Sequence, residues 1–223
     1  RKIYFDNARR LLVRALPLPV IRASHIGKDF KVDSKLSKSV WRTARPVHME
    51  CTLKDGVATP EISTSVRALW SDKYLYLGYE CPFTRLTVFE PAERKKERYG
   101  LWDRDVVEAF IGSDASNLKH YYEFEVSPSG EEIDLELGGT TKGLDWNSGF
   151  QSVAKLNRKT GWYNVEIRIP LSALNPVAPA AGSRWRLNLY RHDIAHNVFL
   201  AWSPTATNTA HTPEKFGNLE FGE

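Results

Sequence analysis

The chain has 223 residues, 42 % of them hydrophobic and 26 % charged, which is enough for one domain with a sizeable core. Its net charge is +4, but residues 1–31 hold eight Lys and Arg and two Asp, whereas the other residues hold 23 Lys and Arg and 25 Asp and Glu. The basic charge therefore belongs to the N-terminal segment. A nucleic-acid-binding main domain is disfavoured, because it would need a basic face. No apolar run approaches the ~20 residues of a transmembrane segment.

Residues 1–19 form a basic arm ahead of the main domain. The pattern over 6–16 predicts a short amphipathic helix capped by Asp6 and ended by Pro17 and Pro19. Docking of this arm onto the domain, or a linker role, is favoured over contact with a membrane surface. The first residue is Arg1, so we expect a processed or trimmed chain.

Two cysteines, Cys51 and Cys81, exclude a disulfide-rich scaffold. The sequence leaves open whether these cysteines form one disulfide bridge or stay as two half-buried thiols.

From residue 62 onward the hydrophobic pattern has a period of two, which predicts many short strands. The predicted strands are 64–70, 74–80, 105–112, 120–127, 132–137, 150–156, 162–170, 184–192 and 198–202. One helical turn is predicted at 171–174. Residues 20–223 are therefore expected to form an all-β fold, a two-sheet antiparallel β-sandwich of the jelly-roll or immunoglobulin-like kind, behind a helical or extended arm.

The predicted strands carry many polar side chains on one of their two faces. Glu123 and Glu125 alternate with Tyr122, Phe124 and Val126, for example. For most of these residues we expect an ordinary solvated outer face. The alternative is a polar platform for a hydroxyl-rich ligand such as a sugar. The tryptophans on strands are expected in the core, namely Trp70, Trp162, Trp185 and Trp202.

Several motifs occur in a characteristic order along the chain. They include Trp-x-x-Asp-x-Val-Glu at 102–108 and Pro-x-x-Phe-Gly at 213–217. The others lie at 29–44, 66–77, 121–130, 161–170, 185–191 and 202–204. Together they resemble the family 9 carbohydrate-binding modules, especially the family 9-like branch of bacterial proteins, over roughly residues 20–222.

The resemblance implies a secreted or periplasmic β-sandwich that binds a mono-, oligo- or polysaccharide without cleaving it, attached to or associated with a glycoside hydrolase. It assigns sugar stacking to Trp102 and sugar hydrogen bonds to Glu108. The family's arginine and asparagine contacts fall here on Glu125 and Ser127. The family's second stacking tryptophan falls on Ala210 and His211, so His211 is a candidate contact and Trp146 a candidate replacement platform. The resemblance also implies structural calcium, for which Asp103, Asp114 and Asp145 offer oxygen ligands.

Three other functions remain as alternatives. A scaffold or protein-interaction sandwich that has lost sugar binding is the first of them. A glycoside hydrolase would need two carboxyl groups ~5–9.5 Å apart, a test that any polar strand passes. A haem-binding electron-transfer domain would have to use His48 and Met49. For Glu108, a salt bridge with Arg186 or Arg191 is the structural alternative to ligand contact.

Overall fold

The computed structural model describes residues 17–140 and 145–223. The predicted helix at 6–16 lies outside these residues. The strands are β1 (Val20–His25), β2 (Val47–Met49), β3 (Cys51–Thr52), β4 (Thr64–Trp70), β5 (Tyr74–Pro82), β6 (Val106–Gly112), β7 (Tyr121–Val126), β8 (Glu132–Leu137), β9 (Gln151–Asn157), β10 (Trp162–Pro170), β11 (Arg184–Asp193), β12 (Val198–Ala201) and β13 (Gly217–Phe221). The helical segments are η1 (Ser39–Thr43), η2 (Pro60–Ile62), η3 (Leu101–Asp103), α2 (Leu171–Leu174) and η4 (Pro213–Lys215). None of the described helices is long and apolar enough to cross a membrane.

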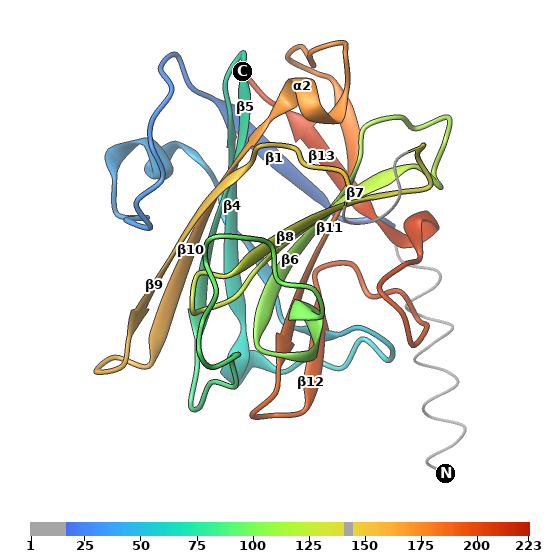
Figure 1. The fold of residues 1–223 in the computed structure, drawn as a ribbon. Coiled ribbons are helices and arrows are strands. Elements are labelled where there is room, and N and C mark those ends of the chain that lie inside the picture. The colour runs from blue at the N-terminus through green and yellow to red at the C-terminus, as the bar shows by residue number, and fades with distance from the viewer. Residues whose placement is uncertain (1–16, 141–144) are drawn as a thin grey trace.

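The strands form two sheets that β1 joins (Figure 1). The strand order is β8-β7-β6-β11-β13-β1 in the first sheet and β1-β4-β5-β10-β9 in the second. β1 is parallel to both neighbours, pairing Val20–Ala23 with β13 and then Ser24 and His25 with β4. The other strand pairs are antiparallel. The expected β-sandwich is confirmed, with one strand shared between its layers.

The main hydrophobic core lies between the two sheets and follows the alternation of the strands. Val107, Ala109 and Ile111 of β6 enter this core, as do Leu187 and Leu189 of β11. Because side chains alternate along a strand, Glu108 and Phe110 must point to the outer face of the first sheet. The ends of the predicted strands agree closely with those observed, because the alternation of polar and apolar residues marks where each strand begins and ends.

The strands that sequence analysis missed are β1, β2, β3 and β13. β2 and β3 are too short to show a period, with three and two residues. Of the four strand tryptophans expected in the core, three are buried. The prediction for Trp162 is wrong, because Trp162 is the first residue of β10, points to the polar face of that strand and is 44 % exposed.

Parts of both outer sheet faces are buried, which corrects the expectation of solvated polar faces for residues such as Glu125 and Glu166. Glu166 of β10 is fully buried beneath the segment that contains η1. Its carboxylate accepts hydrogen bonds from Trp41 Nε1 at 2.7 Å and from the Ser34 backbone N–H at 2.8 Å. It also pairs with Lys38 Nζ at 2.7 Å. Polar outward-facing residues here fasten the covering segments to the sheet.

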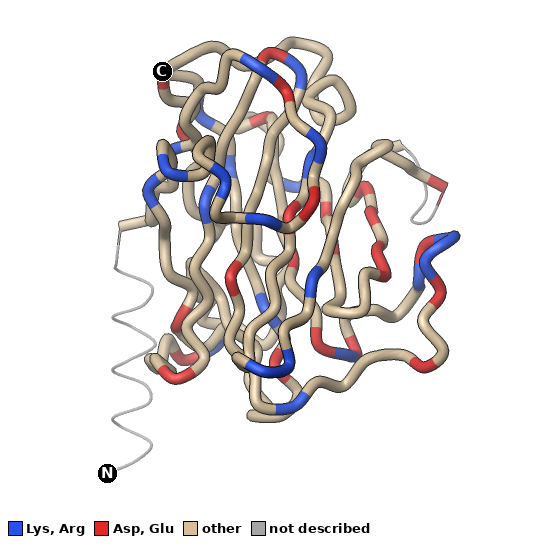
Figure 2. The backbone as a smooth tube through the Cα atoms, turned by 90° about the vertical axis from the view of Figure 1, so that its left-hand side faces the viewer, with Lys and Arg blue, Asp and Glu red and all other residues tan. Residues whose placement is uncertain are grey.

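Acidic side chains concentrate on three neighbouring strands of the first sheet. β6, β7 and β8 carry six Asp and Glu between them and no Lys or Arg. Figure 2 shows Lys and Arg spread over the side nearest the viewer and a run of Asp and Glu along strands at the right-hand edge. The near-neutral charge of the domain therefore hides a local excess of negative charge.

The two cysteines are free thiols. Cys81 is fully buried in the core, and Cys51 is partly exposed on β3. The bridge that the sequence left open is not formed.

Candidate functional site

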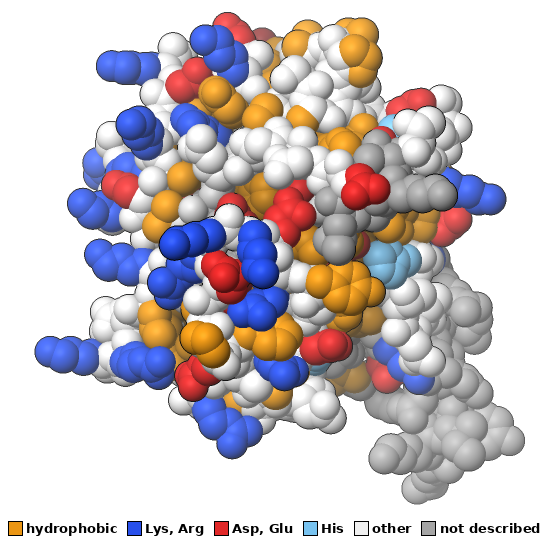
Figure 3. All heavy atoms as spheres, in the orientation of Figure 1, with side chains coloured by type: hydrophobic (Ala, Val, Ile, Leu, Met, Phe, Trp, Pro, Cys, Tyr) orange, Lys and Arg blue, Asp and Glu red, His pale blue; other side chains and the backbone are white. Residues whose placement is uncertain are grey.

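The candidate site is a pocket of about 480 Å³ on the outer face of the first sheet. Ligand pockets commonly have volumes of ~300–1,000 Å³. Its lining comes from the loop ending at η3, strands β6, β7, β8, β11 and β12, and the loop before η4: Tyr99, Trp102, Glu108, Phe110, Glu123, Leu135, Leu137, His192, Phe199, Asn208, Thr209, Ala210 and His211. In Figure 3, acidic, hydrophobic and histidine side chains meet on the face turned to the viewer.

One wall of the pocket is aromatic. Trp102 lies in η3, and Tyr99 meets it edge-on with ring centroids 4.9 Å apart. Gly100 between them has φ +78°, a left-handed conformation that favours glycine, so the backbone can turn into η3 here. His192 Nδ1 donates a hydrogen bond to the Trp102 carbonyl at 2.8 Å. Trp102 is therefore fixed to β11, and its partly buried side chain packs against a small hydrophobic cluster while lining the pocket.

The opposite wall is the loop before η4, which buried polar groups of β11 hold in place. Asn188 Nδ2 donates to the Ser203 carbonyl at 2.8 Å, and the Tyr190 hydroxyl donates to the Ala210 carbonyl at 2.8 Å. His211 Nδ1 and the Tyr121 hydroxyl are 2.8 Å apart. These contacts present the exposed His211 ring to the pocket from a fixed position.

Three glutamates meet at the floor of the pocket. Glu108 and Glu125 are paired across β6 and β7, and Glu123 lies two residues before Glu125 on the same face. One carboxylate oxygen from each lies within 4.8 Å of the others. All three side chains are buried, and each has at least one oxygen without a hydrogen-bond partner. Glu108 and Glu123 line the pocket, and Glu125 lies behind them.

This arrangement favours retention of protons on the glutamates. Burial, and then the nearby Glu123 carboxylate, raise the pKa of Glu108 well above its ordinary value. Burial, then Glu108 and then the neighbouring Glu123 carboxyl, raise the pKa of Glu125 in the same way. For Glu123, burial raises the pKa, while the neighbouring Glu125 carboxyl and the nearby His211 oppose the rise. In the unliganded protein the floor therefore favours protonated carboxyls, at Glu108 and Glu125 above all.

The buried carboxyls predict that the unliganded protein loses stability as pH rises. Glutamates of the unfolded chain ionise near pH 4.3, whereas Glu125, beside Glu108, Glu123, Asp103 and His211, keeps its proton to higher pH when folded. Above pH 4.3 the folded state then holds more protons than the unfolded state, so stability falls with rising pH. Glu125→Gln should leave stability unchanged at pH 4.5 and raise it by about 1–3 kcal/mol at pH 7.5.

Urea denaturation at the two pH values, in the presence of a chelator, measures this effect. Glu214→Gln is the matched control, because Glu214 is an exposed glutamate near the same pocket. The control should keep the wild-type pH profile. An unchanged profile in Glu125→Gln would contradict the protonated floor.

The structure brings together Trp102, Glu108, Glu125 and His211, four of the six residues selected from the sequence. Ser127 is fully buried in the turn after β7, where its hydroxyl is 2.7 Å from that of Ser129. Trp146 stacks on Tyr122 at 4.8 Å, on the core side of the sheet. Neither residue lines the pocket, because alternation turns Tyr122 away from the face that carries Glu123.

The salt bridge considered for Glu108 is not formed among the described residues. Arg191 points inward between the sheets, where it pairs with Asp193 at 2.6 Å. Arg186 donates instead to backbone carbonyls around η4. Glu108 faces the pocket, and the described part of the chain gives it no ionic partner.

Sequence analysis missed Tyr99, Glu123, His192 and Phe199 as pocket residues. Tyr99 could have been found from the sequence, since it is an aromatic residue next to Gly100, just before the motif that begins at Trp102. Phe199 had none, because only the pairing of β12 with β11 brings it beside His192. Glu123 was recognised as polar, but its partners across the strands were not readable from the sequence.

The aspartates considered for calcium do not form a common cluster. Asp103, Asp114 and Asp145 are all exposed, and Asp114 accepts hydrogen bonds from Ser116 in its own turn. In the described part of the chain, the one group of three side chains close enough to share an ion is the glutamate floor. Structural calcium stays a prediction, without ligands among these aspartates.

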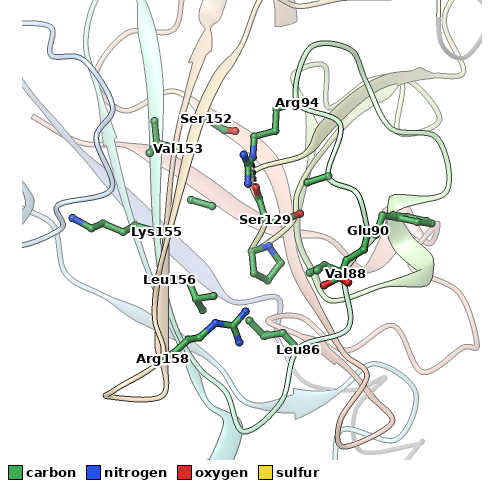
Figure 4. A pocket seen from close by; sticks show the side chains of 15 residues that line it. Leu86, Val88, Glu90, Arg94, Ser129, Ser152, Val153, Lys155, Leu156 and Arg158 are labelled. Atoms are coloured by element: carbon green, nitrogen blue, oxygen red, sulfur yellow. Dashed lines mark hydrogen bonds between the residues drawn. The ribbon is translucent and has the colours of Figure 1, made fainter.

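A second hollow, of about 670 Å³, lies between β9, the segment after β5 and the turn after β7. Figure 4 shows Leu86, Val88 and Leu156 around it, with Arg94 against Ser129. Its one aromatic side chain, Phe89, is covered by the guanidinium groups of Arg98 and Arg104. Within residues 17–140 and 145–223, this hollow offers no exposed ring on which a sugar could stack.

Comparison with known proteins identifies the family. A family model described as carbohydrate family 9 binding domain-like matches residues 32–223. The chain belongs to this family. The family 9-like domain is also 26 % identical over 193 residues to a protein of Arthroderma benhamiae named "Extracellular protein", a match that covers 78 % of this chain and 85 % of that protein.

Solved structures share the fold of the family 9-like domain. A family 9 module from Caldicellulosiruptor kristjanssonii in complex with cellotriose has a TM-score of 0.66 at 17 % identity, covering 92 % of this chain and 94 % of that one. A family 9 module from the same organism in complex with glucose has a TM-score of 0.63 at 18 % identity, and the match covers 92 % of this chain and 97 % of that one. A proposed carbohydrate-binding protein from Bacteroides uniformis has a TM-score of 0.73 at 15 % identity, and the match covers 92 % of this chain and 99 % of that one. At these identities the likeness is one of fold.

Proposed function

We propose that this domain binds a carbohydrate, without cleaving it, in the pocket formed by Trp102, Glu108, Glu123 and His211. The single observation that carries the proposal is an exposed aromatic wall facing buried carboxyl groups across a pocket of sugar-binding size. An indole face covers the apolar C–H side of a sugar ring, and carboxyl groups bond its hydroxyls. Membership of a family of carbohydrate-binding domains supports the proposal.

The glutamates act in binding rather than in hydrolysis. A glycosidase holds two carboxyl groups on either side of the scissile bond, ~5–9.5 Å apart. Here three carboxylates converge at one floor, with oxygens within 4.8 Å of one another. A ligand would contact them from one side only.

We further propose that the domain is secreted and works beside enzymes that handle polysaccharides. The relative named "Extracellular protein" supports secretion. A scaffold role without sugar binding is the alternative function, favoured by the absence of a second tryptophan from the pocket lining within the described residues.

Calorimetry with glucose, cellotriose and other neutral oligosaccharides tests sugar binding. Trp102→Ala should weaken binding by about 5- to 150-fold, because a stacked ring contributes ~1–3 kcal/mol per aromatic in related stacking interactions. Trp162→Ala is the matched control, since Trp162 is an exposed tryptophan of β10 outside the pocket lining. Its affinity should equal that of the wild type. Absence of binding to every sugar, or equal losses in both variants, would refute sugar binding at this pocket.

A further inference from the structure

The pocket floor holds three buried glutamates for which the described residues supply no cationic partner. Glu108 and Glu123 are 2 % and 4 % exposed, line the pocket and have unpartnered oxygens. Glu125 behind them is fully buried, with both oxygens unpartnered. Among the residues that the structure describes, the pocket lining holds no Lys or Arg, and β6, β7 and β8 carry none. A buried carboxylate without a partner is costly, so the floor favours a ligand that brings a positive charge.

The walls restrict the kind of cation. Tyr99, Trp102 and Phe199 surround the space above the floor, together with the rings of His192 and His211. Aromatic faces attract organic ammonium groups by cation–π interaction. A small metal ion such as calcium instead takes 6–8 oxygen ligands. Apart from Asn208 and Thr209, the described walls are rings and aliphatic side chains, which suit an amine attached to an apolar ring.

We propose that the preferred ligand is an amino sugar with a free amine, such as a glucosamine unit of a deacetylated chitin-type chain. This inference rests on the proposed function and names its substrate class. The ammonium group lies over Glu108 and Glu123, the sugar ring packs on Trp102, and Glu125 adds charge from behind. Binding expels the protons held by the glutamates, because an adjacent cation favours their ionised form.

Calorimetry at pH 6 compares three probes on the full chain: the trimer of glucosamine, the trimer of N-acetylglucosamine and cellotriose. We expect the glucosamine trimer to bind at least tenfold more tightly than the other two. Repeating its titration in two buffers of different ionisation enthalpy should show net proton release. All titrations contain a chelator, and a parallel series contains added calcium.

Glu123→Gln isolates the charge, because the amide keeps the size and hydrogen-bonding capacity of the side chain. It should lower the affinity for the glucosamine trimer at least tenfold more than it lowers that for cellotriose. Glu214→Gln, exposed and outside the pocket lining, should change neither. A circular dichroism spectrum and melting temperature like those of the wild type establish that the variant is folded.

The outcomes separate this inference from the proposed function. Cellotriose binding that equals or exceeds glucosamine binding overturns the amino-sugar inference and keeps the carbohydrate function. Binding of no sugar overturns both. Calcium that binds in the wild type but not in Glu123→Gln, and that abolishes the glucosamine preference, overturns the inference by assigning the floor to a metal ion. A tenfold preference lost only in Glu123→Gln supports it.

Discussion

Glu166→Ala should destabilise the domain by about 3–5 kcal/mol, because several buried or part-buried donors lose their acceptor at ~1–3 kcal/mol each. The fully buried Glu166 carboxylate accepts from Trp41 Nε1 and from two backbone N–H groups, and it pairs with Lys38. Without it, these buried donors lose their acceptor, and the segment around η1 loses its attachment to β10. Urea denaturation followed by tryptophan fluorescence measures both effects, since Trp41 is buried in that segment.

The matched control for this variant is Glu220→Ala. Glu220 forms a salt bridge with Arg22 at 2.9 Å, but the Arg22 side chain is 68 % exposed. Exposed ion pairs contribute ~0–1 kcal/mol, so the control should be nearly as stable as the wild type. A loss below 1 kcal/mol in Glu166→Ala, equal to that of the control, would show that the covering segment does not depend on this carboxylate.

Arg191→Met should also cost about 3–5 kcal/mol, because it leaves the buried Asp193 without its cation. Arg191 continues the inward-facing series of β11 and is fully buried. Its guanidinium donates to the Ile62 and Pro82 carbonyls and to Thr64 Oγ1, which belong to the second sheet or its connections. One side chain therefore links the two layers at the end of the core.

A double-mutant cycle with Asp193→Asn tests the origin of this loss. If the cost lies in the unpaired Asp193 carboxylate, Arg191→Met with Asp193→Asn should be more stable than the sum of the single variants predicts. His196 remains beside position 193 in every variant, with its Nδ1 2.8 Å from Asp193 in the wild type. Strict additivity in denaturation experiments would assign the cost to the carbonyl contacts instead.

Strand positions were readable from the sequence where one face of a strand is apolar over six or more residues. β7 and β10 show this pattern, and the periods of Tyr122, Phe124 and Val126 and of Val165 and Ile167 give their core faces. β2 and β3 are too short to carry a period. β1 was not predicted from the sequence. It passes from one sheet to the other, and this is a property of strand pairing rather than of composition.

Only part of the candidate site could be predicted from the sequence, because local patterns do not show which strands pair. Trp102 and Glu108 stand in a recognisable motif, and the motif places one at the loop and the other on the strand. The error at Trp146 arose because a loop tryptophan can fold to either side of a sheet, and here it stacks on Tyr122. Glu123 became a site residue only through the register that sets Glu108 beside Glu125.

The sequence by itself determined a β-sandwich of the family 9 type and a charge that is nearly neutral outside residues 1–31. Only the tertiary structure decided that the acidic residues of β6 and β7 converge below an aromatic wall, buried and without a Lys or Arg partner among the described residues. The reason is physical. Alternation along one strand is a local property, whereas charge density and burial depend on which strands pair and which loops cover them.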